Sequence, residues 1–311
     1  MLAGAKKKLL FWAALCMFGY IWFEAEAIYC LLRESGYKKK QGEVLVYSAA
    51  DIYCSAITPS ATGGQPVCAW FMARDGVPIG VASALLLVFL IMHTLATMTL
   101  GLVCLFMDPS VFLGFSILSK LLILLGYLAL AGITAFFIIL LSKAEWIFKK
   151  GAQVIGWLHK KNIIKRKEYW TDRYRKVITD YSDSVGLMKS NGYMLFAIYE
   201  LNLLQRLVQQ LVTPLVYLAT GGVTKNAVPV FVTQVFSAIG SMWVPVPGGM
   251  GFADYLLIDG LHAVLDKQEA IQLELLSRGL SFYVCVLVSL LIVLIGYIHR
   301  RRLYFSFRMK R

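Results

Sequence analysis

Five stretches of this chain remain predominantly apolar for more than 20 residues, and this feature limits the fold more than any other. They lie near residues 9–32, 79–107, 111–141, 193–220 and 271–298. About 20 apolar residues in a helix cross the hydrocarbon core of a bilayer, where only helices and closed barrels satisfy their backbone hydrogen bonds. A barrel would show alternating segments of about 10 residues. The stretches therefore predict an all-α polytopic membrane protein with about five full spans.

The composition agrees with this class. Hydrophobic residues make up 59% of the 311 residues and charged residues 16%, compared with roughly 25% charged residues in ordinary soluble domains. These proportions exclude a soluble globular enzyme and a disordered chain.

Two further apolar stretches, 44–74 and 226–266, are interrupted by proline and glycine. The interruptions are residues 59–66 and 245–251, and each flanking half is too short to cross a bilayer. Irregular backbone at membrane depth persists only where protein buries it or where it lines a wet cavity. We therefore expect two re-entrant helical hairpins, while external loops with amphipathic helices remain the alternative.

The distribution of charge predicts the orientation. With five crossings and two re-entrant hairpins, 23 of the 31 Lys and Arg lie on one side and five on the other. Basic residues collect in the cytoplasm, so we place the C-terminus and the 12 Lys and Arg within 143–189 there. The lysines at 6–8 fall on the opposite side, which an additional upstream span would correct.

The expected organisation is a single transmembrane domain, residues 1–311. An odd crossing between the halves makes the hairpins enter from opposite sides, which is the inverted repeat of many secondary transporters, with broken helices meeting near the midplane. Its parts are a first half at 1–107 with its hairpin at 44–74, a linking span at 111–141, a basic amphipathic cytoplasmic segment at 142–192, a second half at 193–298 with its hairpin at 226–266, and a basic cytoplasmic tail at 299–311.

The hairpin tips are the first candidate binding site. Each contains a Gly-Gly pair just before a new half-helix, and a helix N-terminus presents free N–H groups and partial positive charge to a phosphate or carboxylate. Tight turns and close helix packing are the alternative reason for the glycines. The candidate lipid-binding residues at the tips are Thr62, Gly63, Gly64, Gln65, Gly248, Gly249 and Gly251.

A polar stripe in the fourth span is the second candidate. Asn202, Gln205, Arg206 and Gln209 recur at helical spacing, and such a stripe faces a partner helix or a wet cavity because lipid contact is costly. Arg206 lies near mid-span, and a guanidinium binds a phosphate through two parallel hydrogen bonds. A structural ion pair with Asp51 or Glu24 remains the alternative, since buried charges are usually paired.

Other charged residues supply partners for these sites. Asp254 follows the second tip, where it either caps the new half-helix or binds a cationic headgroup. Glu274 and Arg278 are spaced for a local ion pair. The candidate charge partners are Glu24, Asp51, His93, Glu200 and Arg278.

No catalytic motif, metal-ligand spacing or dinucleotide-binding loop is present in the sequence, and the six cysteines form no CxxC pair. We therefore expect no catalytic residues, no metal, no cofactor and no cleavable signal peptide. The net charge of +13 fits cytoplasmic loops that meet anionic lipid, and we expect no nucleic-acid partner.

Three motifs carry a family resemblance. They are residues 57–66 with 74–78, residues 200–206, and residues 245–254. Together they resemble the lysylphosphatidylglycerol synthase transmembrane-region family, which includes the membrane half of the multiple peptide resistance factor. The resemblance implies a flippase in the bacterial plasma membrane that moves lysyl-phosphatidylglycerol or a similar aminoacylated lipid to the outer leaflet and so confers resistance to cationic antimicrobial peptides.

The chain departs from the family in two respects. Asp254 stands where the family usually has Glu, and the family usually has one more N-terminal span than we expect in this chain. Relatives that synthesise the lipid carry a large cytosolic domain that transfers lysine from tRNA, so we do not expect synthesis by this chain. The alternatives are phosphatidylglycerol lysyltransferase or another lipid-linked transferase, a flippase for a different anionic or glycosylated lipid, and a structural or regulatory subunit.

The expected partners follow from these assignments. They are a phospholipid, aminoacyl-phosphatidylglycerol or another lipid with an anionic phosphate, and the anionic inner leaflet. The segment 143–189 alternates basic and aromatic residues and is expected to lie on that leaflet as an amphipathic helix. The sequence leaves a homodimer open.

Overall fold

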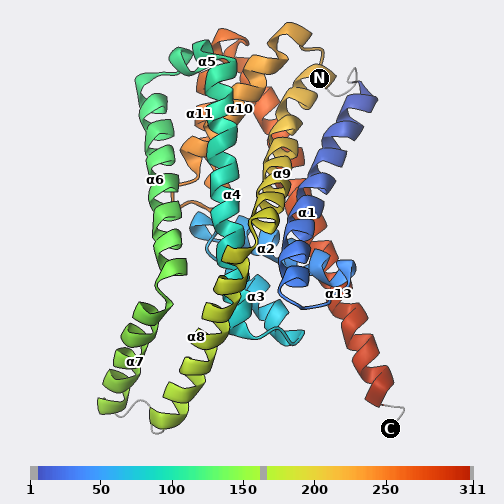
Figure 1. Ribbon diagram of the computed structural model, residues 1–311. Helices are drawn as coiled ribbons and strands as arrows, with labels where there is room; N and C mark the ends of the chain where they lie inside the picture. The colour runs from blue at the N-terminus through green and yellow to red at the C-terminus, as the bar shows by residue number, and fades with distance from the viewer. Residues whose placement is uncertain (1–5, 162–166, 309–311) are drawn as a thin grey trace.

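A computed structural model describes residues 6–161 and 167–308, and every regular element within these ranges is helical. Figure 1 shows an elongated bundle with the N-terminus at one end and the C-terminus at the other. The elements are α1 (Lys7–Glu34), α2 (Gln41–Ile57), η2 (Pro59–Ala61), α3 (Gly64–Arg74), α4 (Ile79–Met107), α5 (Pro109–Gly114), α6 (Ile117–Ser142), α7 (Ala144–Lys160), α8 (Lys167–Ser190), α9 (Gly192–Ala219), η3 (Thr224–Asn226), α10 (Ala227–Ser241), η4 (Pro247–Gly249), α11 (Phe252–Gly260), η5 (Leu261–Ala263), α12 (Lys267–Arg278), η6 (Gly279–Val284) and α13 (Cys285–Arg308).

Four helical stretches within the described ranges are long and apolar enough to cross a membrane: α1, α4, α6, and the stretch Lys267–Ile298 that joins α12 to α13. This confirms an all-helical protein with several membrane-spanning helices. The fourth predicted span corresponds to α9, which has 28 residues but lies outside this set. Its buried amides and guanidinium make it less apolar, and it lies between α1, α4 and α10 instead of facing lipid. A count of five spans stays a prediction.

The predicted span at 111–141 is wrong at its beginning. The chain forms a separate short helix, α5, and starts α6 only at Ile117. Side-chain caps explain the break, because the Asp108 carboxylate accepts from the Ser110 N–H at 3.2 Å and the Ser116 hydroxyl accepts from the Ser119 N–H at 3.3 Å. A cap satisfies backbone donors that a continuous helix would otherwise pair internally.

The last predicted span is helical throughout but not uniformly α-helical. The segment η6, Gly279–Val284, is a π-helix between α12 and α13. A π-helical turn is an insertion that commonly marks functional sites. Apolar periodicity over 271–298 gave no sign of it, because the residues on both sides of the insertion are equally apolar.

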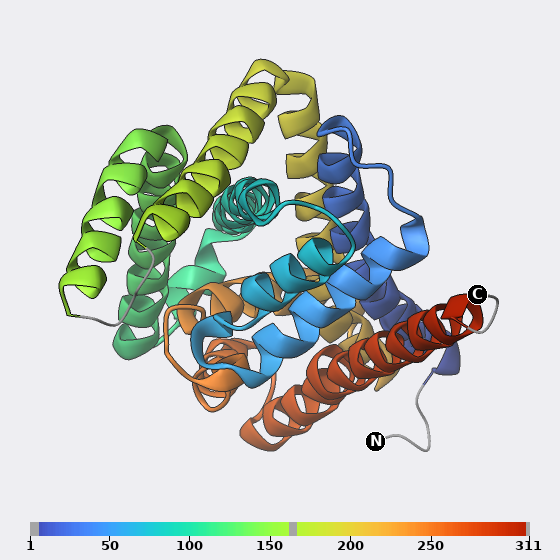
Figure 2. The same ribbon diagram turned by 90° about the horizontal axis from the view of Figure 1, so that it is seen from below.

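The two interrupted stretches form helix–turn–helix pairs. In the first, α2 packs against α3 across η2, and in the second, α10 packs against α11 across η4. The turns η2 and η4 contact one another, as expected for the tips. Figure 2 shows the α2–α3 pair lying alongside α13 near the centre of the bundle. This arrangement brings together two prolyl turns that are almost 190 residues apart in sequence.

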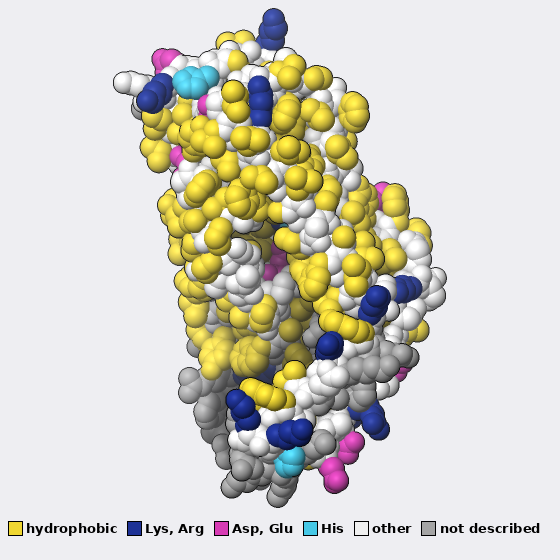
Figure 3. Space-filling view, turned by 90° about the vertical axis from the view of Figure 1, so that its left-hand side faces the viewer, with side chains coloured by type: hydrophobic (Ala, Val, Ile, Leu, Met, Phe, Trp, Pro, Cys, Tyr) yellow, Lys and Arg dark blue, Asp and Glu magenta, His cyan; other side chains and the backbone are white. Residues whose placement is uncertain are grey.

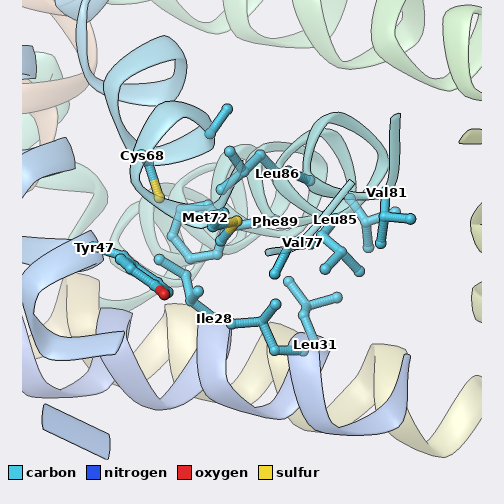
Figure 4. Close-up of a cluster of buried hydrophobic side chains, with 14 of the residues drawn as sticks. Ile28, Leu31, Tyr47, Cys68, Met72, Val77, Val81, Leu85, Leu86 and Phe89 are labelled. Atoms are coloured by element: carbon cyan, nitrogen blue, oxygen red, sulfur yellow. The ribbon is translucent and has the colours of Figure 1, made fainter. Parts of the chain in front are cut away.

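The interior is built from helices distant in sequence. α1 packs along α9, α2 lies against α13, and α4 contacts both α8 and α9. Figure 4 shows one buried apolar cluster, in which Ile28 and Leu31 of α1 meet Tyr47 of α2, Met72 of α3 and Leu85 of α4. This cluster fixes α1, α2 and α4 relative to one another, and these three helices carry much of the candidate site.

The basic segment forms two antiparallel helices, α7 and α8, which continue α6 and α9 lengthwise (Figure 1). The segment is therefore divided into two helices where one amphipathic helix was expected, and its position on the inner leaflet stays a prediction. The C-terminal half of α8 packs into the bundle, because Tyr181, Val185 and Met188 are buried in one cluster with residues of α1, α2, α3 and α4. In Figure 3, basic side chains gather toward this end, while the middle of the molecule is apolar and hollowed, with acidic atoms visible in the hollow.

Candidate functional site

The two tips share a backbone conformation. Ser60 and Ala61 follow Pro59 with φ of 51° and 54°, and Gly248 and Gly249 follow Pro247 with φ of 60° and 61°. The residues before both prolines, Thr58 and Val246, are extended. Conformation therefore pairs Ser60-Ala61 with Gly248-Gly249, whereas the sequence comparison paired Gly63-Gly64 with Gly248-Gly249.

Most N–H groups at the first tip already have partners. The Ala61 N–H donates to the Thr58 carbonyl at 3.2 Å, the Thr62 N–H to the Pro59 carbonyl at 3.3 Å, and the Gly63 N–H to the Thr58 hydroxyl at 2.9 Å. Thr62 itself is exposed. These donors stabilise the turn and are not directed at a ligand.

The second tip is satisfied in the same way. The Gly249 N–H donates to the Val246 carbonyl at 3.0 Å, and the Met250 N–H to the Pro247 carbonyl at 3.3 Å. The Gly251 N–H donates to the Asp254 carboxylate at 2.9 Å, so Asp254 caps α11. These hydrogen bonds stabilise tight turns at both tips, and lipid binding by the tip residues stays a prediction.

Gly64 has a packing role. A Cβ atom at this position would overlap both the carboxylate and the backbone carbonyl of Asp51. Next to it, the Gln65 amide donates to the Asp51 carboxylate at 2.8 Å, and the Ser55 hydroxyl donates to the same group at 3.0 Å. Glycine thus lets α3 approach α2 closely enough for Gln65 to hold Asp51.

A cluster around Arg278 joins α12 to the second tip. Arg278 forms an ion pair with Asp254 and a second with Glu274, whose oxygen lies 3.0 Å from Arg278 Nε. Its guanidinium also donates to the Gly248 carbonyl at 3.4 Å. The local Glu274–Arg278 pair is confirmed, and the contacts with the tip were not foreseen.

The polar stripe of α9 faces inward. Gln205 is fully buried, and Asn202 and Arg206 are 1% and 8% exposed. The Arg206 guanidinium contacts the His93 ring of α4, donates to the Gln209 amide oxygen at 2.6 Å, and lies over the Tyr20 ring of α1 at 5.9 Å. We use the term polar core for Glu24, Asp51, His93, Asn202, Gln205, Arg206 and Gln209.

Arg206 has only uncharged direct partners. None of the ion pairs formed by the described side chains includes it, although Glu24 lies close enough to interact electrostatically. Its Nε atom is buried without a hydrogen-bond partner among these residues. The structural ion pair with Asp51 or Glu24 is thus not formed in this structure.

The rest of the polar core consists of amides, hydroxyls and carboxyls. The Asn202 amide oxygen accepts a hydrogen bond from His93 Nδ1 across 3.2 Å, and the Gln205 amide donates to Glu24 at 2.6 Å. Within the described ranges, no group of three His, Cys, Asp or Glu side chains is placed to hold a metal ion. A buried guanidinium beside amides and carboxyls suits the binding of a charged group.

Sequence reasoning missed two participants and included one outlier. Gln210 is buried with an unpartnered amide oxygen, and Tyr20 stacks beneath Arg206. Tyr20 lies one helical turn before Glu24, so helical spacing in α1 would have found it. Glu200 is exposed on the outer side of α9 and lies outside the polar core.

Comparison with known proteins agrees with the resemblance seen in the motifs. Neither a curated protein nor a solved structure was found to match the chain. The model of one family, described as the lysylphosphatidylglycerol synthase TM region, matches residues 2–289. That range contains both tips, α9 and the whole polar core, so the chain belongs to the lysylphosphatidylglycerol synthase transmembrane-region family.

Proposed function

We propose that the protein moves a phospholipid between leaflets and that Arg206 binds the lipid phosphate. The observation that carries this proposal is a buried guanidinium whose direct partners are all uncharged. A charge at the centre of a membrane helix costs about 2.5–3.5 kcal/mol on insertion scales, and a buried charge normally has a counter-ion. A phosphodiester would supply one negative charge and acceptors for the free Nε group.

The family supports a lipid-related function, and from it we take aminoacylated phosphatidylglycerol as the substrate class. The proposed direction is from inner to outer leaflet of a bacterial plasma membrane, with resistance to cationic antimicrobial peptides as the consequence. A different anionic or glycosylated lipid would use the same phosphate contact. The family description also names a synthase, so transfer of lysine from charged tRNA is the competing activity.

The proposed architecture has α2–α3 and α10–α11 as re-entrant hairpins of an inverted repeat. Three features support it: contact between η2 and η4, matched backbone conformations at the two tips, and capping within each pair of short helices. The α2 and α10 helices have 17 and 15 residues, fewer than the roughly 20 needed to span. Five full spans put the two termini on opposite sides of the membrane, and the distribution of Lys and Arg favours a cytoplasmic C-terminus.

The α7–α8 pair is proposed to meet the anionic inner leaflet. On α7, Trp146 and Trp157 are exposed and share a helical face, and Lys150 and Lys161 lie over their rings at 6.0 and 4.5 Å. Tryptophan favours the membrane interface, and lysine is attracted to anionic headgroups. Replacing Lys150 and Lys161 with Gln should weaken the preference for anionic nanodiscs without changing thermal stability.

The phosphate-binding role is tested with purified protein in vesicles that contain the aminoacyl lipid. Its amine is labelled from outside by a membrane-impermeant reagent, and the rate of exposure reports transport. Arg206→Lys should slow transport about tenfold or more, and Arg206→Gln further, because an ammonium lacks the paired donors of a guanidinium. Arg33→Gln, an exposed arginine on α1, serves as the matched control.

Two results would contradict the proposal. Normal transport by a folded Arg206→Gln variant would exclude phosphate binding at this residue. Formation of labelled lipid from charged tRNA, without transport, would favour the transferase. A double variant, Arg206→Gln with Asp51→Asn, should not recover transport, whereas a structural pair would be rescued.

A further inference from the structure

Two carboxyl groups of the polar core are not explained by phosphate binding. Glu24 on α1 and Asp51 on α2 are 4% and 5% exposed, and neither forms an ion pair with any described residue. They interact electrostatically with one another. Buried carboxyls without a cationic partner are unfavourable in a membrane and commonly mark ion or proton pathways.

The direct partners of both carboxyls are neutral donors. Gln205 donates to one Glu24 oxygen at 2.6 Å, and Ser55 and Gln65 donate to Asp51 at 3.0 and 2.8 Å. The second Glu24 oxygen and the Gln205 amide oxygen are buried acceptors without any hydrogen-bond partner among the described residues. Buried acceptors of this kind need a partner, which a donor proton, a cation or a water molecule can supply.

The charges of the polar core do not balance. Arg206 contributes one positive charge, while Glu24 and Asp51 contribute two negative charges when ionised. His93 Nε2 faces the Arg206 guanidinium and therefore acts as an unprotonated acceptor. The other titratable groups among the described residues that interact with this cluster are Tyr20 on α1, Cys54 on α2, Cys68 on α3 and Cys285 on α13, and all four are neutral near pH 7. One further positive charge would neutralise the core.

We propose that Glu24 and Asp51 form a binding site for one monovalent cation, either a proton or Na⁺, whose occupancy is coupled to lipid binding at Arg206. The Gln205 amide oxygen and the second Glu24 oxygen supply the ligands that the structure leaves unpartnered. Cation binding stands on the carboxyl geometry alone, while its coupling to lipid rests on the proposed function.

The direction of coupling follows from the charge. A phosphodiester at Arg206 adds one negative charge to a core that already carries one in excess. Neutralising Glu24 or Asp51 removes this repulsion, so the cation should tighten lipid binding, and by linkage the lipid should tighten cation binding by the same factor. Allosteric couplings are typically about 5–150-fold, and we expect roughly tenfold.

The cation site is tested first on the purified full chain in detergent without added lipid. Thermal unfolding is followed while Na⁺ replaces choline at constant ionic strength, and separately while the pH is varied between about 5 and 8. One of the two changes should stabilise the wild type. Glu24→Gln and Asp51→Asn should each lose that response, and Glu26→Gln, a partly exposed carboxyl on the same helix, should keep it.

The outcomes separate the two possible cations and the two proposals. A response to Na⁺ at constant pH identifies sodium, and a response to pH alone identifies a proton. An identical response in the wild type and in both carboxyl variants overturns the cation site. If one variant fails to fold, the other decides, since each removes one of the two charges.

Lipid binding is then measured with vesicles that contain fluorescent aminoacyl lipid. Affinity should rise about tenfold with the cation in the wild type, and it should be independent of the cation in Glu24→Gln. If lipid binding by the wild type requires Arg206 but does not depend on the cation, the coupling is rejected and the proposed function remains. Retained cation stabilisation with binding indifferent to Arg206→Gln rejects the proposed function and leaves the cation site in place.

Discussion

Each hairpin tip holds two consecutive residues with positive φ, but only the second tip fills those positions with glycine. Ser60 and Ala61 carry a Cβ in a backbone region that L-residues avoid, at a cost of about 1–2 kcal/mol each. Non-glycine residues persist there when the surrounding structure imposes the conformation. The prolyl turn and its contact with η4 impose it here.

This difference predicts opposite effects of mutation at the two tips. Ala61→Gly should stabilise the protein by about 0.5–1 kcal/mol, because the relieved strain exceeds the entropy that glycine adds to the unfolded chain. Gly248→Ala should destabilise it by more than 1 kcal/mol, because the new Cβ is strained and would also overlap the Phe282 ring. Thermal unfolding in detergent measures both changes.

Gly132→Ala is the control for these substitutions, since that glycine lies in helix α6 with open space around its Cβ position. It should be neutral or stabilising. If Ala61→Gly lowers stability as much as Gly248→Ala does, strain does not distinguish the tips.

The burial of single residues was predictable where helical spacing placed several polar side chains on one face, since exposing such a face to lipid is costly. A guanidinium and three amides on one face of α9 cannot face lipid, and Asn202, Gln205 and Arg206 are indeed buried. The partners of Arg206 were not predictable, because His93 and Tyr20 reach it from α4 and α1. Nothing local in the sequence specifies which of several buried groups a long side chain will contact.

At the scale of elements, an ionic cluster ties the second hairpin to the last span. Arg278 ties α12 to α11 and to the tip through Asp254, Glu274 and the Gly248 carbonyl. The first hairpin has polar contacts within itself, from Ser55 and Gln65 to Asp51. It also has hydrogen bonds to α1, from Ser48 to the Ile21 carbonyl and from Gln41 to Glu26. A π-helix follows Arg278 directly, so the second hairpin is coupled to an irregular part of the last span.

Removing this tie should cost stability. Arg278→Gln leaves Glu274, whose side chain is only 7% exposed, without its cationic partner, and breaking a buried pair costs about 3–5 kcal/mol. We expect the lower end, about 3 kcal/mol, because Asp254 is partly exposed. The double variant Arg278→Gln with Glu274→Gln should recover part of the loss, which a double-mutant cycle in detergent measures.

Lys267→Gln, at the exposed start of the same helix, is the matched control and should change stability little. Equal losses in this control and in Arg278→Gln would mean that the cluster does not hold the hairpin.

The ends of helices were predicted well where the hydrophobicity of the sequence changes and poorly where it stays the same. The bounds of α4 match the predicted span, since Pro78 and Asp108 flank an unbroken apolar run. The break before α6 lies between two apolar segments and depends on the Ser116 cap. The correspondence of Ser60-Ala61 with Gly248-Gly249 depends on their positive φ angles. The sequence does not show these angles, because Ser60 and Ala61 are not glycines.

At the scale of the whole molecule, the expected inverted repeat predicted that the two tips would meet near the midplane. The contact between η2 and η4 agrees with that expectation. The packing of α1 along α9 did not follow, although it builds the polar core by bringing Glu24 to Gln205. Repeat symmetry relates equivalent elements, whereas the site depends on contacts between non-equivalent ones.

Orientation in the membrane is the last whole-molecule prediction. The charge bias of 23 to 5 Lys and Arg exceeds what random placement would give, and basic residues are retained on the cytoplasmic side. Introduced into a cysteine-free background, Lys160→Cys at the end of α7 should be unreactive toward an impermeant maleimide in intact cells and reactive after lysis. Lys267→Cys at the start of α12 should react in intact cells.

The two sites are good reporters because both residues are exposed and the predicted topology places them on opposite sides of the membrane. A thermal-unfolding measurement on each variant confirms that labelling reports the native fold. Reaction of Lys160→Cys from outside would invert the whole arrangement: the α7–α8 pair would leave the anionic inner leaflet, and the α2–α3 hairpin would open to the exterior. Lipid would then reach Arg206 from the opposite side of the membrane. Labelling of the two cysteine variants therefore tests both the topology and the proposed direction of transport.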